Sequence, residues 1–148
     1  EQGLAKHIGV ANFTAALLRE AAKLSKAKLV NNQIEMHVYL DQSKVIAECE
    51  KQGMSVTAYS PIVKGAASKD ETLQKIGARH KKSAAQISLR YLVQQGIIAI
   101  PRTSKPERLS ENAAIFDFEL SDAEMQAIRA LADPNGRRIN PSWAPDWD

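Results

Sequence analysis

The chain has 148 residues, is 44% hydrophobic and 25% charged, and carries a net charge of +3. These values describe a folded protein with a sizeable core, and the length alone predicts one domain. No apolar run approaches the roughly 20 residues that span a bilayer, and the small basic excess does not indicate a nucleic-acid-binding protein. The single cysteine, Cys49, cannot close an intrachain disulfide, and the first residues form no hydrophobic targeting segment. We therefore expect a cytoplasmic protein without membrane or nucleic-acid partners.

Four short apolar runs predict β-strands, and each is followed by a segment with helical spacing. The runs are residues 7–10, 29–35, 55–59 and 97–100. Alternating strands and helices predict an α/β fold built on a parallel sheet. The second run contains Asn31, Asn32 and Gln33, whose amides need hydrogen-bond partners if the strand is buried.

Helix starts are predicted by the pattern Ser-x-x-Glu/Gln, in which the serine and the residue three positions later cap free amides of the first turn. The pattern begins at Ser68, Ser83, Ser104 and Ser121. Two glycines, Gly53 and Gly96, are expected to end helices over 43–52 and 83–95. A loop over 60–67, a further helix over about 69–80 and a polar tail after residue 133 complete the predicted order.

Four parallel βα units raise a physical difficulty for a sheet on its own. Four βα units in an open sheet need helices on both faces, or else the sheet must close on something. Residues 1–4 read like the end of a helix that enters a strand. Both features predict that the chain begins inside a fold.

No catalytic constellation is visible. The three histidines lie far apart, and no metal-ligand spacing, phosphate-binding Gly-rich loop or Gly-x-Ser-x-Gly turn is present. His37 is the best acid–base candidate by position, but nothing near it in sequence activates it, so a structural or surface role is the favoured interpretation. Cys49 shares a helix face with Val45 and Ile46, which predicts a core position.

A basic turn follows the fourth predicted strand. Within residues 100–108, Arg102 and Arg108 lie close to the predicted start of a helix, together with two hydroxyl residues and a lysine. A helix N-terminus favours anions, and arginine adds forked donors that suit a phosphate. The alternative is a solvated basic turn.

Polar and aromatic residues also follow the other predicted strands. Asn12 follows the first strand, Gln33 lies in the second, and Tyr59 ends the third. Parallel α/β folds bind ligands at the carboxyl ends of their strands, and a tyrosine there offers a flat face to a ring. The alternative for Tyr59 is an ordinary core or rim aromatic.

Four motifs in the same order together resemble the aldo-keto reductase family, whose segments read Gly-Val-Ser-Asn-Phe, Asn-Gln-Ile-Glu-x-His-Pro-Tyr-Leu, Ala-Tyr-Ser-Pro-Leu and Ile-Pro-Lys-Ser…Arg-Ile-x-Glu-Asn. The matching segments here are residues 9–13 (GVANF), 32–40 (NQIEMHVYL), 58–62 (AYSPI), and 100–103 (IPRT) with 108–112 (RLSEN). The ending, residues 144–148, is similar to bacterial members of the diketogluconate and methylglyoxal reductase type.

The resemblance implies a (β/α)8 TIM barrel that uses NADPH to reduce an aldehyde or ketone. It makes residues 1–148 the C-terminal half of one barrel domain, with strands five to eight and residues 133–148 as a tail. The resemblance implies that Asn12 and Gln33 contact the nicotinamide carboxamide, that Tyr59 stacks on the nicotinamide ring, and that Ser60 and Ile62 lie along the pyrophosphate. It implies that Arg102, Thr103 and Arg108 bind the 2′-phosphate with Ser104 nearby, and that Glu111 and Asn112 reach the adenine. Trp143 or Trp147 would cover the carbonyl substrate, and the alternative for the tryptophans is packing across the barrel rim.

Three departures from the family pattern concern the cofactor site. Ala11 stands where the family usually has serine, Val38 replaces the usual proline, and residues 63–65 lack some polar pyrophosphate contacts that Lys64 can replace by charge. One neutral hydrogen bond contributes about 1 kcal/mol, so cofactor binding is expected to survive the loss of the serine.

The family's catalytic Asp, Tyr, Lys and His lie in the first half of the barrel, and His37, Tyr39 and Tyr59 do not match them. We therefore expect this chain to supply most of the cofactor site of an NADPH-dependent oxidoreductase, to be inactive alone, and to need the missing N-terminal half as its partner. The alternative is a non-catalytic NADPH-binding half-barrel that pairs with another half or with itself.

Overall fold

The computed structural model describes residues 3–148, so Glu1 and Gln2, where the predicted helix end begins, lie outside the described residues. One parallel sheet has the strand order β1-β2-β3-β4. Its strands are β1 (Ile8–Ala11), β2 (Leu29–Glu35), β3 (Ser55–Tyr59) and β4 (Ile98–Ala99). The prediction of an α/β fold with a parallel sheet is confirmed, and the fourth strand is shorter than expected because only two of its residues pair with β3.

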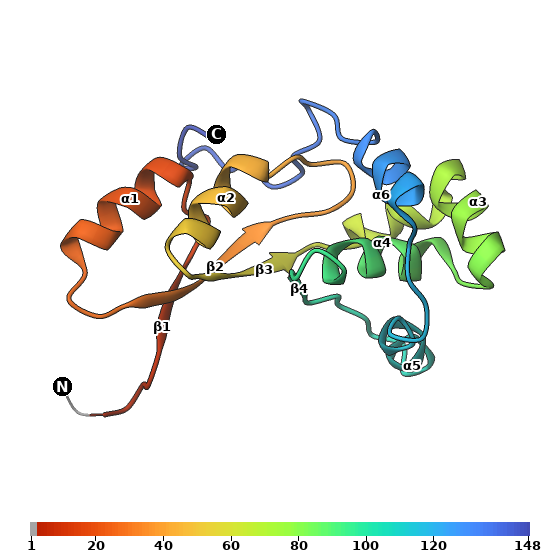
Figure 1. The fold of residues 1–148 in the computed structure, drawn as a ribbon, viewed down its shortest axis with the longest axis horizontal. Helices are drawn as coiled ribbons and strands as arrows, with labels where there is room; N and C mark the ends of the chain where they lie inside the picture. The colour runs from red at the N-terminus through yellow and green to blue at the C-terminus, as the bar shows by residue number, and fades with distance from the viewer. Residues whose placement is uncertain (1–2) are drawn as a thin grey trace.

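Helices connect the strands, so each connection crosses back to the start of the next parallel strand (Figure 1). They are α1 (Ala15–Leu24), α2 (Ser43–Lys51), a 3₁₀ segment η1 (Val63–Lys69), α3 (Glu71–His80), α4 (Ala84–Val93), α5 (Glu107–Ala113) and α6 (Asp122–Arg129). The expected glycine stops are confirmed: Gly53 and Gly96 follow α2 and α4 with positive φ angles of 64° and 77°. Within residues 3–148, no helix has the length and apolar character needed to cross a membrane.

Two of the four predicted serine caps are confirmed. Ser83 and Ser121 each accept a hydrogen bond from the backbone of the residue three positions later, whose side chain bonds back. The predictions at Ser68 and Ser104 are wrong. Asp70, directly before Glu71, caps α3 through Leu73 N (3.0 Å), and α5 follows Pro106, whose fixed φ suits a first turn without a side-chain cap.

The predicted loop over 60–67 is also partly wrong, because its second half forms η1. Lys64 and Gly65 have left-handed backbone angles in its middle, with φ of 51° and 91°, and divide the segment into two short turns. A glycine tolerates this conformation without strain, whereas lysine does not.

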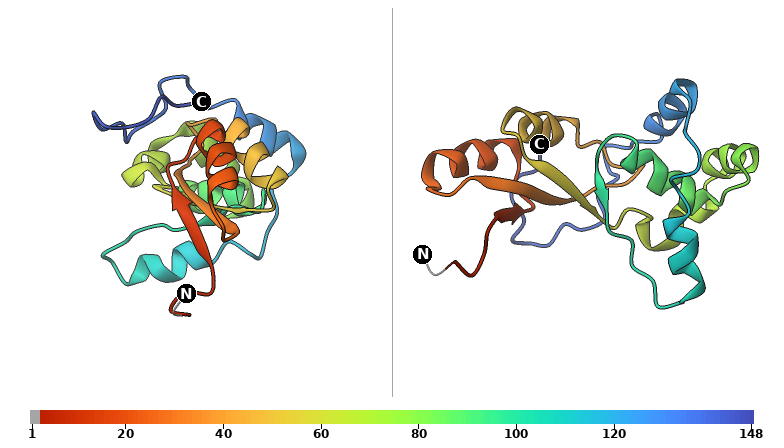
Figure 2. Two further views of the ribbon diagram at one scale, coloured as in Figure 1. Left: turned by 90° about the vertical axis from the view of Figure 1, so that its left-hand side faces the viewer. Right: turned by 60° about the horizontal axis from the view of Figure 1, so that its bottom comes forward.

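The sheet has two different faces. On one face, Ile34, Val56 and Ala58 are buried in a core that also contains Leu18 of α1 and Cys49 of α2. The core position predicted for Cys49 is therefore confirmed. Helices α1 and α2 lie side by side along the strands, as the views of Figures 1 and 2 both show. Since successive side chains of a strand point to opposite faces, the other face carries the polar alternates of β2 and β3.

The three amides of β2 divide between these faces. Asn32 is fully buried, where Nδ2 donates to Phe13 O (2.9 Å) and Oδ1 accepts from Phe13 N (3.4 Å). Asn31, on the opposite face, donates to Ser55 Oγ and Thr57 Oγ1, both at 2.9 Å. The amides thus join β2 to the segment after β1 and to β3, and so fix the register near the strand ends.

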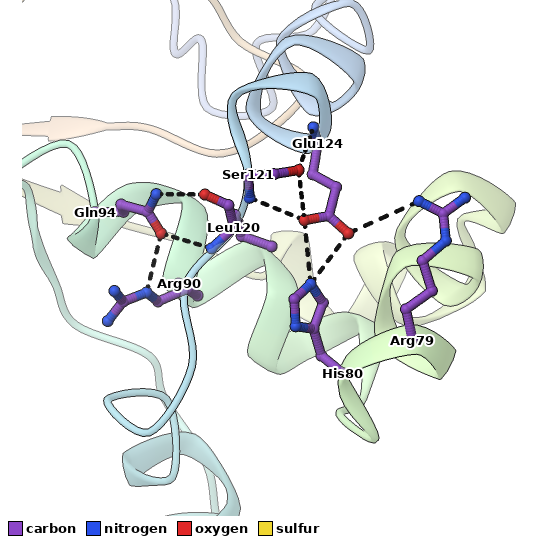
Figure 3. A network of polar contacts seen from close by, with 7 residues as sticks. All are labelled: Arg79, His80, Arg90, Gln94, Leu120, Ser121 and Glu124. Atoms are coloured by element: carbon purple, nitrogen blue, oxygen red, sulfur yellow. Dashed lines mark hydrogen bonds and ion pairs between the residues drawn. The ribbon is translucent and has the colours of Figure 1, made fainter.

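Helix α6 is attached to α3 through one carboxylate (Figure 3). Glu124, in the first turn of α6, contacts His80 Nε2 with both oxygens (3.0 and 3.1 Å) and lies 3.8 Å from Arg79. The same carboxylate accepts from the backbone N–H of Ser121 (2.9 Å). The backbone of Leu120, just before α6, is bound by the side-chain amide of Gln94, which donates to Leu120 O (2.7 Å) and accepts from Leu120 N (2.9 Å). These contacts set the direction in which the chain continues into its tail.

The tail after residue 133 contains neither helix nor strand, as predicted. It begins at a close contact with the loop after β2: Asp133 N donates to Tyr39 O (3.1 Å), and a Cβ atom on Gly136 would clash with the same carbonyl. The chain then returns along the sheet, so that its C-terminus lies beside the start of α1 (Figure 1).

Candidate functional site

Two residues predicted to face the cofactor meet where β1 and β3 end. The Tyr59 hydroxyl donates to Asn12 Oδ1 at 2.9 Å. Asn12 has a left-handed φ of 59°, a conformation that asparagine tolerates better than most residues, and its backbone N–H donates to Gln33 O (2.9 Å). The three residues therefore form one cluster across three strands, although they are far apart in the sequence.

The side chain of Gln33 lies on the polar face of the sheet. It is half-buried, and its neighbours in register are Ala11 of β1 and Thr57 of β3. Within residues 3–148 its side-chain amide forms no hydrogen bond, so a donor and an acceptor remain available for a ligand beside Asn12.

Ser60 and Ile62 follow Tyr59 in a turn with an unusual backbone. Ser60 and Val63 have positive φ angles of 55° and 49°, and Ser60 O accepts from Val63 N (2.9 Å). Left-handed angles at a serine and a valine cost free energy, and such angles cluster where a backbone is shaped for a ligand. The turn begins directly after Tyr59.

The basic turn after β4 is exposed. Arg102 and Arg108 form no ion pair in the described part of the chain, and Thr103, not Ser104, organises the turn by accepting from Lys105 N (3.0 Å). Both guanidinium groups thus keep their donors free for an anion.

The two residues predicted at the adenine lie in α5. Asn112 is half-buried, and Glu111 accepts a 2.6 Å hydrogen bond from the hydroxyl of Ser83, the cap of α4. Glu111 therefore already has a structural partner that holds α5 against α4.

His37 is not arranged as an acid–base group. It is 1% exposed, Nδ1 accepts from Tyr39 N (3.3 Å), and Nε2 lies 3.1 Å from the Glu35 carboxylate. These partners together fit the neutral tautomer with hydrogen on Nε2, because Nδ1 must accept. Of the predicted structural or surface role, burial supports the structural one and rules out the surface one.

The pKa values of Tyr39 and Tyr59 lie above the ordinary value of a tyrosine. Burial, followed by the hydrogen bond to Asp70, raises the pKa of Tyr39 to about 12, and burial and the nearby Glu35 carboxylate raise the pKa of Tyr59. Proton transfer is most effective when the pKa of the group lies near the working pH. Neither tyrosine has been shifted in that direction.

The structure adds residues that sequence reasoning missed. Glu35, at the end of β2, is fully buried and accepts from Arg138 N (2.8 Å) and Ile139 N (2.9 Å) of the tail. Burial opposes its ionisation, but the hydrogen bonds from His37 and the tail hold its pKa below the ordinary value. The signal was a charged residue inside an apolar run, which demands buried partners.

The two tail tryptophans have different surroundings. Trp143 is 79% exposed, whereas the ring of Trp147 covers the Arg137 guanidinium at 3.7 Å and its Nε1 donates to Asn140 Oδ1 (2.8 Å). Trp147 and Arg137 also line a cavity of about 750 Å³ between the tail and the start of α2. None of the predicted cofactor residues lines that cavity.

Comparisons with known proteins agree with the four motifs. The family model described as "Aldo/keto reductase family" matches residues 1–133. The chain belongs to the aldo/keto reductase family. Among curated members, it is 40% identical to aldose reductase B of Dictyostelium discoideum over 96% of this chain and 46% of that protein. It is 35% identical to methylglyoxal reductase DkgB of Escherichia coli O157:H7 over 100% of this chain and 56% of that protein.

Solved aldo/keto reductase structures have the same fold. A crystal structure of "a putative 2,5-diketo-D-gluconic acid reductase B" superposes with a TM-score of 0.94 at 49% identity and covers 97% of this chain and 52% of that one. The Bombyx mori aldo-keto reductase in complex with NADP superposes with a TM-score of 0.84 at 34% identity, over 95% of this chain and 48% of that one. This chain thus spans about half the length of the relatives that it matches.

Proposed function

We propose that this chain carries most of the NADPH-binding site of an aldo/keto reductase that reduces an aldehyde or ketone to an alcohol. The observation that carries the proposal is the cluster of Asn12, Gln33 and Tyr59 at the carboxyl ends of adjacent parallel strands. That edge is where parallel α/β folds bind ligands. The NADP complex of the Bombyx mori relative supports the choice of cofactor.

The residues present fit the nicotinamide end of this cofactor. The free amide of Gln33 and the side chain of Asn12 supply the donor and acceptor that a carboxamide requires, and the half-buried Tyr59 offers its ring face. Ala11, in the position of the family's serine, provides no hydroxyl, so the carboxamide depends on the two amides. Bound NADPH would supply a hydride to the carbonyl carbon of the substrate.

The phosphate end of the cofactor is assigned to the basic turn. Arg102 and Arg108 lack ion-pair partners within residues 3–148, and Thr103 adds a hydroxyl beside them. Ser60 and Ile62 are assigned to the pyrophosphate because their strained turn follows Tyr59 directly. Ser104 is assigned to the vicinity of the 2′-phosphate. Glu111 and Asn112 are assigned to the adenine, where Glu111 would accept from the adenine while keeping its hydrogen bond from Ser83.

We also propose that residues 1–148 form the second half of one (β/α)8 barrel, with 133–148 as its tail and Trp143 facing the carbonyl substrate. The coverage of 46% and 56% of the two curated relatives named above supports this division. The catalytic acid of the reaction would then come from the other half, because Tyr39, Tyr59 and His37 do not match the family's catalytic positions and His37 is buried against Glu35. The chain alone is expected not to reduce a carbonyl compound.

Replacement of Arg102 and Arg108 by alanine tests the cofactor assignment. A charge-assisted hydrogen bond contributes about 1.5–3 kcal/mol, so losing the phosphate contacts is expected to weaken NADPH binding about tenfold to hundredfold while NADH binding stays unchanged. Fluorescence titration of the 148-residue chain measures both affinities. An equal loss for NADPH and NADH would contradict the assignment to the 2′-phosphate. Lys105→Ala, in the same exposed turn, is the matched control.

The second candidate function is a non-catalytic NADPH-binding half-barrel that closes with another half or with a second copy. The observation that favours it is the pair of open sheet edges: in the described residues, β1 pairs only with β2 and β4 only with β3. Unpaired edges promote association. Sedimentation of the purified chain as a monomer at micromolar concentration would contradict closure with a second copy.

A further inference from the structure

The end of β2 holds the C-terminal tail through a single buried carboxylate. Glu35 pairs in register with Tyr59 and is 0% exposed. Its Oε1 accepts from Arg138 N at 2.8 Å, and its Oε2 accepts from Ile139 N at 2.9 Å. His37 Nε2 lies at 3.1 Å from Oε1. A buried carboxylate is strongly unfavourable unless its oxygens are hydrogen-bonded, so the tail is part of what makes this side chain tolerable.

The rest of the tail runs from β2 back to α1. Arg137 lies 3.8 Å from Glu35 Oε2 and stacks under the ring of Trp147 at 3.7 Å. The side chain of Asp148 accepts from Ala15 N at 2.7 Å, at the first residue of α1. Ala15 follows Asn12 by three positions, so the tail ends close to the proposed carboxamide site.

Arg137 of the tail lies near Tyr59, because its partner Glu35, 3.8 Å away, is the register neighbour of Tyr59 in the sheet. The charges of Glu35 and Arg137 act on the Tyr59 hydroxyl in opposite directions, the first raising its pKa and the second lowering it. The guanidinium atom Nη1 of Arg137 is buried without a hydrogen-bond partner in the described chain, so it depends on the Glu35 carboxylate and the Trp147 ring.

We propose that Glu35 is a positioning residue, which latches tail residues 137–148 beside Tyr59 and through them supports the nicotinamide end of the cofactor site. The role of the latch in cofactor binding rests on the proposed function, whereas the latch itself rests only on the contacts above. Loss of the carboxylate should release the tail without unfolding the sheet, because Ile34 and Val56 pack on the opposite face.

Both tryptophans of the chain lie in the tail, so tryptophan fluorescence, excited at a wavelength that the tyrosines do not absorb, reports on the tail alone. In a Trp143→Phe background, Trp147 is the single reporter. Glu35→Gln removes the charge and turns an N–H₂ group toward the backbone donors Arg138 N and Ile139 N. Because hydrogen bonds to charged groups are strong, the fraction of molecules with a released tail should rise about tenfold or more. We expect stronger quenching of Trp147 by acrylamide and a red-shifted emission, with an unchanged far-UV circular dichroism spectrum.

Glu48→Gln in the same background is the matched control. Glu48 is also a buried carboxylate with an arginine partner, Arg19 at 3.0 Å, but it contacts no tail residue. Equal quenching of Trp147 in the Glu35 variant and in this control would overturn the latch. If the Glu35 variant does not fold, hydrogen exchange of the backbone amides in the unaltered chain tests the latch instead. Slow exchange at the N–H groups of Arg138 and Ile139 supports the latch, and exchange at the rate of free peptides overturns it.

A second experiment measures the affinities of the same variants for NADPH and for NADH. The latch predicts that Glu35→Gln weakens both nucleotides by the same factor, because the nicotinamide end is common to them. If Trp147 is released and both affinities stay unchanged, the coupling to the cofactor site is wrong. If the unaltered chain binds neither nucleotide, the proposed function fails while the quenching result still decides on the latch.

Discussion

Glu124 satisfies three neighbours at once: the backbone N–H of Ser121, His80 and, at longer range, Arg79. Burial opposes its ionisation, but the hydrogen bonds from Ser121 and His80 outweigh burial and lower its pKa. A carboxyl group with a lowered folded pKa stabilises the protein above its unfolded pKa and loses that effect as the pH falls through the folded value.

Glu124→Gln is therefore expected to lower the free energy of unfolding at neutral pH and to matter less as the pH falls below the ordinary value of 4.5. Urea unfolding of the unaltered chain and the variant, at matched pH values, measures the difference. Glu119→Gln, at an 84% exposed side chain near the same helix, is the control. A difference that grows toward acid pH would contradict this account.

The sequence predicted which residues lie together where those residues stand at the carboxyl ends of neighbouring parallel strands. Asn12, Gln33 and Tyr59 were expected together because parallel strands bring their carboxyl ends to one edge, and the structure joins Asn12 to both others. The role of Glu35 was not predictable, since its partners Arg138 and Ile139 lie more than 100 residues away and act through backbone N–H groups that any residue carries.

Helix caps show why a sequence pattern is not sufficient at the scale of an element. Ser121 caps α6 because the helix begins directly after it. Ser68 fits the same pattern, yet Asp70 stands closer to the buried Leu73 and takes the cap of α3, so that Ser68 falls into η1. The pattern identifies residues able to cap, and the position of the first buried turn selects among them.

Ser121→Ala is expected to reduce the stability of the protein by about 1 kcal/mol, whereas Ser68→Ala should change it by less than about 0.5 kcal/mol. The first change removes the acceptor for Glu124 N, while the second removes a hydroxyl that forms no hydrogen bond in the described chain. Thermal or urea unfolding distinguishes the two variants. Equal losses would restore Ser68 as the cap of α3.

The start of the tail gives a second test at this scale. A Cβ atom at Gly136 would clash with the Tyr39 carbonyl, and neither backbone segment can move without losing the contact between Asp133 and Tyr39. Gly136→Ala should therefore detach the tail and increase the quenching of Trp147, as the Glu35 variant does. Asn135→Ala, at an exposed position of the same turn whose side chain forms no hydrogen bond within residues 3–148, is the control for stability. Undisturbed quenching in the Gly136 variant would contradict the observed packing.

At the scale of the whole molecule, the four strands and their order were predictable because apolar runs, helical spacing and helix stops all indicated the same βα repeat. The helix contacts through His80 and Glu124, and the path of the tail, were not, since they depend on how distant elements pack. The family motifs supplied the expected site, and residues 9–13, 32–40 and 58–62 run through the carboxyl ends of β1, β2 and β3.

We propose that this chain binds NADPH through Asn12, Gln33 and Tyr59 at the strand ends and through the free arginines after β4. Isothermal titration of the purified chain with NADPH and with NADH is the decisive measurement. We expect saturable binding of one NADPH per chain, tighter than that of NADH, with no turnover of an added aldehyde. The absence of NADPH binding by a chain with a native circular dichroism spectrum would contradict it.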